Sequence, residues 1–488
     1  MSTGSSDTLS QPMRRPLREL AALPGPLALP LIGNMLQITP LRVHLDMEAW
    51  ARRYGRLFRV RLGRTPVLVV ADHELIAAIL RDRPDGFRRP DITARLAREM
   101  GGIPGLFLAE GAEWRNQRRM VMQGFAPHAI KAYFPALVQV ALRLEQRWLT
   151  AARAQQTISL SADLKRYTVD IIAGLAFGTE VNTIDSGDDV IQGHLDNIFN
   201  GIARRVYSLV PYWRWFKLPV DRRLDRSVAA VREAVLGFIA TARERMAADP
   251  ALRSRPGNLL EAMLAAADEA GSGVDDATVA GNVQTMLLAG EDTTANTIGW
   301  LIHLLHAHPE ALARAQEEVR RIAPACAAYS IEQMDAMLYL DACAQEAMRL
   351  KPVAPFLPVE ATRETMVGDV RVPERTLVWC VLRHESMAAA HFPQPALFDP
   401  ARWLAPRDGE ANASRADKRM SVPFGSGPRT CPGRYLALLE IKIALAMLLG
   451  RFDIENVDTA DGMPVQEHMG FVMSPVGLRM RLREAQRA

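Results

Sequence analysis

Apolar side chains recur on nearly every face of the helix that residues 277–308 would form, and this is the longest regular pattern in the chain. Asp275 or Asp276 can cap its first turn, and Pro309 marks its end. Residues 434–449 show a second helical pattern without a polar face. Helices of this kind must be covered by protein on all sides, so both are predicted to lie in the core.

Short runs rich in β-branched residues predict a small amount of sheet, at residues 57–62, 66–70 and 370–381. Most of the remaining chain has helical patterns, and no internal repeat or linker divides it. Although 488 residues would suit about three domains of ~150 residues, two helices that are apolar all round require one thick core. The sequence therefore predicts a flexible polar segment over residues 1–22, followed by a single mainly α domain with a small β region over residues 23–488.

Composition and charge exclude several classes of protein. With 49% hydrophobic and 23% charged residues, the chain has the composition of a globular protein. Its 59 basic and 55 acidic side chains leave a net charge of +4, which is too balanced for a chain whose main partner is nucleic acid. The four cysteines contain no CxxC pair, which argues against a zinc ribbon or a thioredoxin-like site and suits a reducing cytoplasm. Arginine far outnumbers lysine, as in proteins of GC-rich bacterial genomes.

Residues 21–41 carry no charge and would be long enough to span a membrane. Four prolines and two glycines within this stretch block a continuous helix and favour an extended backbone. The residues before it are polar and lack the apolar centre of a signal peptide. We therefore expect a cytoplasmic protein without a membrane anchor.

The densest cluster of turn-forming residues surrounds Cys431, directly before the second buried helix. Neighbouring glycines let backbone N–H groups approach the sulfur, and the positive end of the helix favours the thiolate over the thiol. This pattern is typical of an anionic sulfur ligand, with a core cysteine in a turn as the alternative. The Gly425-x-Gly427 spacing also suggests a dinucleotide-binding loop, but Thr430 stands where the third glycine should be, so we reject that reading.

The spacing Phe424-x-x-Gly427-x-Arg429-x-Cys431-x-Gly433 resembles the haem-binding loop of the cytochrome P450 superfamily. By this resemblance, Cys431 is the thiolate ligand of the iron of haem b. Phe424, Gly427 and Gly433 would shape the loop that holds the haem. Arg429 would bind a haem propionate through charge-assisted hydrogen bonds.

Trp114 and Arg118, four residues apart, would share one face of a helix. On their own they suggest a surface cation–π pair. The family uses such a Trp-x-x-x-Arg pair to hold haem propionates, so the resemblance implies this role here. Val359 stands about where many members place a further propionate-binding arginine, which leaves the anchoring of the propionate on that side open.

Glu346-x-x-Arg349 is one of five Glu-x-x-Arg sequences in the chain, and such i, i+3 pairs usually lie on the surface. Glu346 differs because it falls on an apolar helical pattern that stops before Pro352, and because an Arg402-Trp403 sequence follows it. In the family, a glutamate and two arginines in this order form a buried triad on the proximal side of the haem. The resemblance therefore gives Glu346, Arg349 and Arg402 a structural role.

Residues 289–294, Ala-Gly-Glu-Asp-Thr-Thr, place acids and hydroxyls in the middle of the long apolar helix, where unpaired polar groups are costly. A kink at Gly290, with threonines bonding back to the helix, is the structural alternative. The segment resembles the oxygen-activating stretch of the family, in which an acid and an alcohol steer protons to dioxygen bound to the iron. Asp292 and Thr293 are the expected catalytic pair.

These features together predict a monomeric haem-thiolate monooxygenase that inserts one atom of O2 into an apolar small molecule of a lipid-like, terpenoid or polyketide-like kind. By resemblance, five segments line its substrate pocket, namely residues 87–108, 198–210, 286–289, 353–357 and 470–473. A peroxygenase or haem-dependent isomerase of the same fold and a non-catalytic haem sensor are the alternatives.

The chain has no room for a flavin or iron–sulfur module after the cysteine loop. Electrons are therefore expected to come from NAD(P)H through a separate ferredoxin or flavodoxin and its reductase. Five cations could present a basic proximal face to such an acidic partner, namely Arg115, Arg119, Lys418, Arg419 and Arg434. Solvated arginines on ordinary helices are the alternative.

Overall fold

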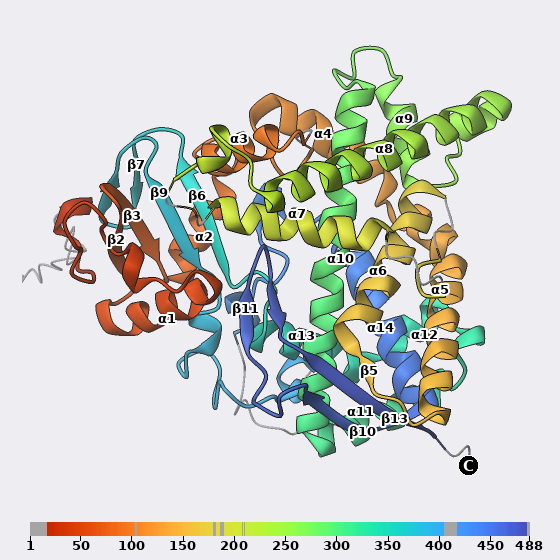
Figure 1. Cartoon of the computed structure of the whole chain (residues 1–488). Coiled ribbons are helices and arrows are strands. Elements are labelled where there is room, and N and C mark those ends of the chain that lie inside the picture. The colour runs from red at the N-terminus through yellow and green to blue at the C-terminus, as the bar shows by residue number, and fades with distance from the viewer. Residues whose placement is uncertain are drawn as a thin grey trace, which may run out of the picture.

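Helices form most of the fold (Figure 1). The computed structural model describes residues 17–102, 105–178, 182–185, 190–206, 208, 210–404 and 417–485. Its helices are α1 (Val43–Tyr54), α2 (His73–Arg81), α3 (Asp91–Glu99), α4 (Gly111–Gly124), α5 (Pro127–Arg153), α6 (Leu160–Phe177), α7 (Val190–Val206), α8 (Pro219–Ala248), α9 (Leu259–Ala267), α10 (Asp276–Ala307), α11 (Pro309–Ile322), α12 (Ile331–Ala336), α13 (Leu338–Leu350) and α14 (Arg434–Arg451). The predicted mainly α fold class is confirmed.

The two helices that were expected to be central are buried in the core. At the start of α10, the side chain of Asp275 accepts the backbone N–H of Thr278, and the helix ends before Pro309. It packs against α6, α9, α13 and α14 and is buried along most of its length. The α14 helix is buried in the same way, as its apolar pattern predicts.

A five-stranded sheet lies beside the helical part, on the side of α1 and α2 (Figure 1). Its order is β2 (Leu57–Leu62), β3 (Thr65–Val70), β9 (Leu377–Val381), β6 (Phe356–Ala361) and β4 (Phe87–Arg88), with β3 and β9 parallel and the other neighbours antiparallel. Alternate residues of β3 face opposite sides of the sheet. Val67 and Val69 belong to the apolar cluster of α1, whereas Leu68 and Val70 belong to that of α2. The strand is apolar throughout because both of its faces are covered.

The remaining strands form three smaller sheets in the described part of the chain. They are β1 (Arg18–Glu19) with β8 (Val370–Val372) and β7 (Thr365–Val367), β10 (Phe452–Thr459) with β13 (Leu478–Glu484) and β5 (Ile158–Ser159), and β11 (Glu467–Met469) with β12 (Met473–Pro475). The strand pattern over residues 370–381 is therefore two strands, separated by a turn. Arg375 in this turn has a φ of 64°, in the left-handed region that favours glycine.

Part of the N-terminal segment lies within the fold. Strand β1 pairs with β8, and the side chain of Arg18 donates to both carboxylate oxygens of Asp369 at 2.9 and 2.8 Å. Residues 1–16 lie outside the described residues. Residues 21–41 form short 3-10 turns and extended backbone. In the described ranges, no helix combines the length and the apolar character that crossing a membrane requires.

Candidate active site

Cys431 lies in a tight loop directly before α14. Its backbone N–H donates to the carbonyl of Phe424 at 3.0 Å, which closes the loop. Gly427 has a φ of 71°, and a Cβ at this position would lie 2.5 Å from the backbone oxygen of Leu80 in α2. Only glycine therefore lets the loop pack against α2. Of the four cysteines, Cys431 is exposed and the other three are buried.

Two opposing effects act on the sulfur of Cys431. Desolvation by the surrounding protein raises the pKa of the thiol above its usual value. The backbone N–H of Gly433 and the guanidinium groups of Arg118 and Arg434 lower this pKa, but less than desolvation raises it. The backbone N–H of the loop thus acts in the expected direction, towards the thiolate, while desolvation acts against it. A metal ion that binds the sulfur would reverse this balance, because a coordinating thiol is deprotonated.

The structure brings Trp114, Arg118 and Arg429 together beside this loop. The guanidinium carbon of Arg429 lies 4.8 Å from the centre of the Trp114 ring, which is buried in α4. Arg118, one turn further along α4, is close enough to both Arg429 and Cys431 to affect their pKa values. These contacts connect α4 to the cysteine loop.

Two further arginines, Arg83 and Arg89, join Arg429 around the single carboxylate of Glu110. Arg429 forms an ion pair with Glu110, and Glu110 also accepts the backbone N–H of Arg89 at 2.9 Å. Arg83 is 4% exposed, and its Nε and Nη2 atoms have no hydrogen-bond partner. Burial lowers the pKa of all three guanidinium groups, that of Arg429 to about 10. No local pattern in the sequence separates Arg83 and Arg89 from the many surface arginines, so neither is predicted as a site residue.

The positive charge of this arginine cluster suits the two propionate groups of a haem. Buried charges are normally paired, yet among the described residues Glu110 is the one carboxylate whose charge acts on all three guanidinium groups. The guanidinium group of Arg89 itself donates to the backbone carbonyl of Phe107 at 2.6 Å. A dianion such as the two propionates of haem would balance the excess and meet the unpartnered nitrogens of Arg83. Val359 is fully buried in the apolar cluster of the sheet.

Glu346, Arg349 and Arg402 form a buried cluster at the end of α13. Arg349 donates to both carboxylate oxygens of Glu346 at 2.8 Å, and Arg402 donates to one of them at 3.3 Å. Glu346 also accepts the indole N–H of Trp403 at 2.8 Å and the backbone N–H of Asp399 at 3.1 Å. Glu346 and Arg349 are both fully buried. The carboxylate thus links α13 to the segment that leads to the cysteine loop.

Asp292 and Thr293 lie in the middle of α10 but point to different partners. Asp292 forms an ion pair with Lys165 of α6, with 2.9 Å between Oδ1 and Nζ. The hydroxyl of Thr293 donates to the backbone carbonyl of Ala289 at 2.7 Å, which is the back-bonding of the structural alternative. Among the contacts described, none joins the Asp292 and Thr293 side chains directly. The sequence around Asp292 does not predict its pairing with Lys165, because Lys165 lies on another helix.

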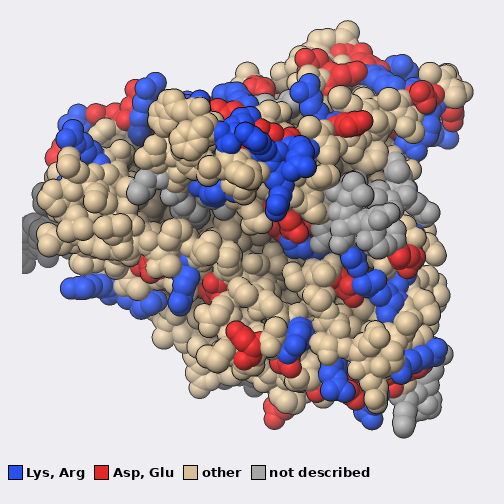
Figure 2. Space-filling view, in the orientation of Figure 1, with Lys and Arg blue, Asp and Glu red and all other residues tan. Residues whose placement is uncertain are grey.

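A cavity of about 680 Å³ opens beside Asp292. The surface is recessed there, between α7 and the β11–β12 hairpin (Figure 2). Charged side chains from three helices line one wall, Lys165, Asp196 and Asp292 among them, while Phe199 and Phe471 supply apolar surface. The ring of Phe471 lies 5.4 Å from that of Phe199 and 5.5 Å from that of Phe107. Three of the five segments expected to line the pocket therefore meet at Phe471.

Glu440 is a second buried acid close to this part of α10. It lies on α14 and its carboxylate accepts a hydrogen bond from the side chain of Thr294. Burial raises the pKa of Glu440 to about 8, and the Thr294 bond acts weakly in the opposite direction. Glu440 should therefore be mostly protonated at neutral pH.

We expect Glu440 to make the protein less stable as the pH rises. Its pKa in the fold lies above the usual value of 4.5, so the folded protein binds more protons than the unfolded chain between those two values, and stability falls through this window. Glu440→Gln should remove this contribution. From pH 5 to pH 8.5, the melting temperature of both proteins is measured by circular dichroism. The fall in the parent should exceed the fall in the variant by about 2 °C or more. If the melting temperatures changed equally with pH in the parent and in Glu440→Gln, this expectation would be wrong.

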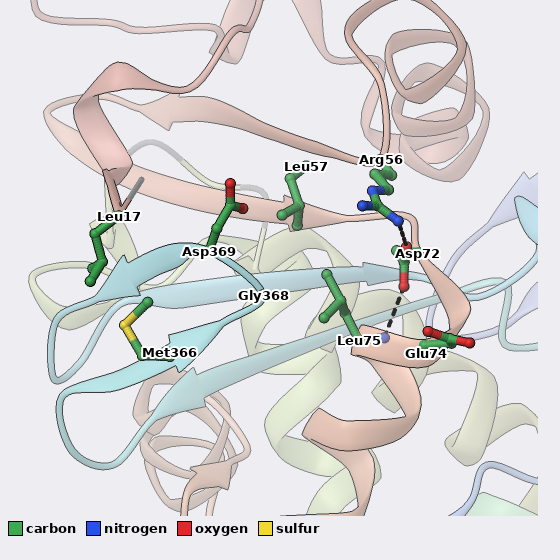
Figure 3. Close-up of a pocket in the computed structure, with 9 residues that line it drawn as sticks. All are labelled: Leu17, Arg56, Leu57, Asp72, Glu74, Leu75, Met366, Gly368 and Asp369. Carbon is green, nitrogen blue, oxygen red and sulfur yellow. Dashed lines mark hydrogen bonds and ion pairs between the residues drawn. The ribbon is translucent and has the colours of Figure 1, made fainter. Parts of the chain in front are cut away.

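Another cavity, of about 480 Å³, lies at the edge of the β1–β8–β7 sheet (Figure 3). Its polar side chains are mostly engaged in structural contacts. Asp72 pairs with Arg56 at 2.7 Å and caps α2 by accepting the N–H of Leu75, and Asp369 pairs with Arg18. We assign no chemistry to this cavity.

Comparison with known proteins gives a family match over most of the chain. The model of the family described as cytochrome P450 matches residues 23–482. The chain is 28% identical to the cyclooctat-9-en-7-ol 5-monooxygenase of Streptomyces melanosporofaciens, over 92% of this chain and 92% of that protein. It is 26% identical to the self-sufficient cytochrome P450 monooxygenase CYP505E5 of Aspergillus niger, over 97% of this chain but 44% of that protein. The chain therefore spans less than half the length of this relative.

A solved structure has the same fold. The haem domain of cytochrome P450DA matches with a TM-score of 0.81 and 24% sequence identity, over 97% of this chain and 99% of that one.

Proposed function

The chain belongs to the cytochrome P450 family, whose model matches residues 23–482, and we propose that it is a haem-thiolate monooxygenase. The main support is the position of Cys431. It is the exposed cysteine among four, in a glycine-dependent loop before a buried helix, and it faces Arg118 with Arg429 and Trp114 beside it. The enzyme would insert one atom of O2 into an apolar organic molecule.

The residues around Cys431 would hold the haem, which when bound supplies the chemistry of O2 binding and O–O cleavage. Cys431 is the proposed ligand of the iron. Phe424, Gly427 and Gly433 would set the shape of the loop. The propionates would bind Trp114, Arg118 and Arg429, together with Arg83 and Arg89. The proposed role of Glu346, Arg349 and Arg402 is to fix the position of the segment that carries the loop.

Asp292 and Thr293 would deliver protons in the proposed reaction. Asp292 lines the cavity beside α10, where it can exchange protons with water. The hydroxyl of Thr293 is half-buried, and the bond described for it is to the Ala289 carbonyl in its own helix. Rotation about one bond would free this hydroxyl to donate to a ligand outside the helix. Asp292 would thus supply protons, and Thr293 would direct them.

Thr293→Val should uncouple electron consumption from product formation. The variant keeps the shape of the side chain but lacks the hydroxyl, so protons are no longer directed and electrons are lost as peroxide. Product formed per NAD(P)H should fall at least several-fold, and the ~10²–10⁴-fold that positioned proton transfer contributes to rate is the upper limit. Thr297→Val is the control, because its hydroxyl makes the same bond to the carbonyl of Thr293 one turn later. Equal coupling in Thr293→Val and the parent would refute the assignment.

We propose a substrate with a largely apolar body. The aromatic side chains of Phe107, Phe199 and Phe471 support this class, because they converge from three segments at one point. The Streptomyces relative is named for oxidising cyclooctat-9-en-7-ol, an apolar alcohol. The charged wall formed by Lys165 and Asp196 would tolerate a polar group at one end of the molecule.

Electrons would reach the site from NAD(P)H through a separate ferredoxin or flavodoxin and its reductase. Arg115, Arg119, Lys418, Arg419 and Arg434 are all exposed. Among the described residues, two of them have acidic partners, since Arg115 pairs with Asp85 and Arg419 with Asp417. The other three supply net positive charge that an acidic protein could meet.

If this basic face guides a ferredoxin, the rate of reduction should fall as the salt concentration rises. Exposed charges are screened beyond ~8 Å at physiological ionic strength, so steering weakens in salt. Stopped-flow reduction at several salt concentrations measures this dependence. A rate that does not depend on salt would favour solvated arginines without a partner.

One assay separates this function from its alternatives. The purified protein is supplied with an apolar ligand found by a binding screen, and product is measured with NAD(P)H, ferredoxin and reductase or with peroxide alone. A monooxygenase requires the electron donors. A peroxygenase would work efficiently with peroxide alone, an isomerase would need neither, and a haem sensor would form no product.

A further inference from the structure

Three carboxylates surround one ammonium group between α6, α7 and α10. Asp196, Glu291 and Asp292 each place one carboxylate oxygen within 4.8 Å of the others. The Nζ of Lys165 lies 2.5 Å from Asp196 and 2.9 Å from Asp292. If all three acids were ionised, the cluster would carry two uncompensated negative charges. Such an excess is costly for the buried members, Glu291 and Asp292, whereas the side chain of Asp196 is partly exposed.

Glu291 is the member of this cluster that lacks a partner. It is fully buried, and within the described part of the chain neither of its carboxylate oxygens has a hydrogen-bond partner. The hydroxyl of Thr168 donates to the backbone carbonyl of Glu291, not to its carboxylate. Burial, and then the charge of Asp292, raise the pKa of Glu291 well above its usual range, against the attraction of Lys165. Glu291 should therefore be a neutral carboxylic acid.

The charged groups that face Glu291 come from each neighbouring helix, namely Lys165 of α6, Asp196 of α7 and Asp292 of α10 itself. A bound divalent cation would be another way to balance three carboxylates. The ammonium of Lys165 already lies between the two aspartates, and their charges raise the pKa of Lys165 despite its burial. A proton on Glu291 would lower the excess from two negative charges to one without a metal ion, and the remaining charge would be shared with Asp196, whose side chain is 45% exposed.

We propose that Glu291 stores a proton and passes it to Asp292, which makes Glu291 a positioning residue for proton delivery. No hydrogen bond joins the two side chains in the described part of the chain, so the proton would pass through one bridging water molecule. The Glu291 acid would protonate this water as the water gives a proton to the Asp292 carboxylate, so one acid and one carboxylate remain after the step. Asp292 would then release the proton into the active site. This last step rests on the function proposed above. Water in the cavity lined by Asp196 and Asp292 would return a proton to Glu291 through the same residues.

Infrared spectroscopy of the haem-loaded protein tests the stored proton without turnover. The parent should show a carboxylic acid C=O band at neutral pH that shifts in D2O and is absent from Glu291→Gln. Glu440 should give a second such band, so Glu440→Gln is measured as the matched control. The Glu291 band must persist in Glu440→Gln. A parent without this band would overturn the proposal, and so would stoichiometric Mn²⁺ binding that Glu291→Gln abolishes.

The rate of product formation and its solvent isotope effect test the proton transfer from Glu291 to Asp292. Glu291→Gln should lower the rate of product formation by roughly tenfold and raise the solvent isotope effect, because delivery of the proton becomes slower. Glu317→Gln changes an exposed acid on α11 and should alter neither quantity. If Glu291→Gln loses the band but keeps the parent rate and isotope effect, the transfer is refuted. A parent that shows the band but forms no product would support the stored proton and contradict the proposed monooxygenase function.

Discussion

Cys431→Ser should abolish the thiolate-type absorption spectrum of the reduced carbon monoxide complex, and substrate oxidation with it. A serine hydroxyl is not a thiolate and cannot donate the same electron density to the iron. None of the other cysteines can replace Cys431. Cys326, Cys343 and Cys380 are all buried, and burial raises the pKa of each thiol, those of Cys326 and Cys380 to about 12.

Cys326→Ser is the control for this experiment, because it removes a buried thiol that lies outside the loop. It should leave the spectrum unchanged. If Cys431→Ser kept the thiolate-type spectrum, the assignment of the iron ligand would be wrong.

Glu346→Ala should yield little or no haem-loaded protein. The carboxylate of Glu346 accepts hydrogen bonds from Arg349, Arg402, Trp403 and the backbone of Asp399. Its removal would leave the buried guanidinium group of Arg349 without its carboxylate, and Arg402 with the more distant Asp399 at 3.6 Å. Breaking a buried ion pair in this way typically costs ~3–5 kcal/mol. Haem content per purified chain, measured by absorbance, reports the loss.

The control for this variant is a substitution of Glu317, which lies in another Glu-x-x-Arg sequence. Glu317 also precedes an arginine by three residues, but it is exposed on α11, and Arg320 pairs with Asp453 instead. Glu317→Ala should therefore be nearly silent. Equal haem content in the Glu346→Ala and Glu317→Ala proteins would contradict a structural role for the triad.

The elements that place this site could be predicted because their signals are local. Residues 277–308 are apolar on every face, and this property alone requires a buried helix, which is α10. The turn-forming residues around Cys431 likewise predict a loop before α14. The strand pattern over residues 370–381 was less informative, because two strands joined by a turn at Arg375 have the same β-branched composition as one.

Partners from distant segments could not be predicted from local patterns. Lys165 meets Asp292 only because α6 packs against α10, and the sequence around Lys165 shows no sign of this contact. Arg83 and Arg89 gather around Glu110 for the same reason. The protonation of Glu291 depends on how deeply three helices bury it, which the order of residues does not reveal.

Isotope labelling with ¹⁸O2 tests the proposed monooxygenase function most directly. The purified protein is supplied with an apolar ligand from the binding screen, NAD(P)H, ferredoxin and reductase, and the product is analysed by mass spectrometry. We predict that each product molecule contains one ¹⁸O atom and that none forms in the Cys431→Ser variant. Product that forms without ¹⁸O, or without O2, would contradict the proposed function.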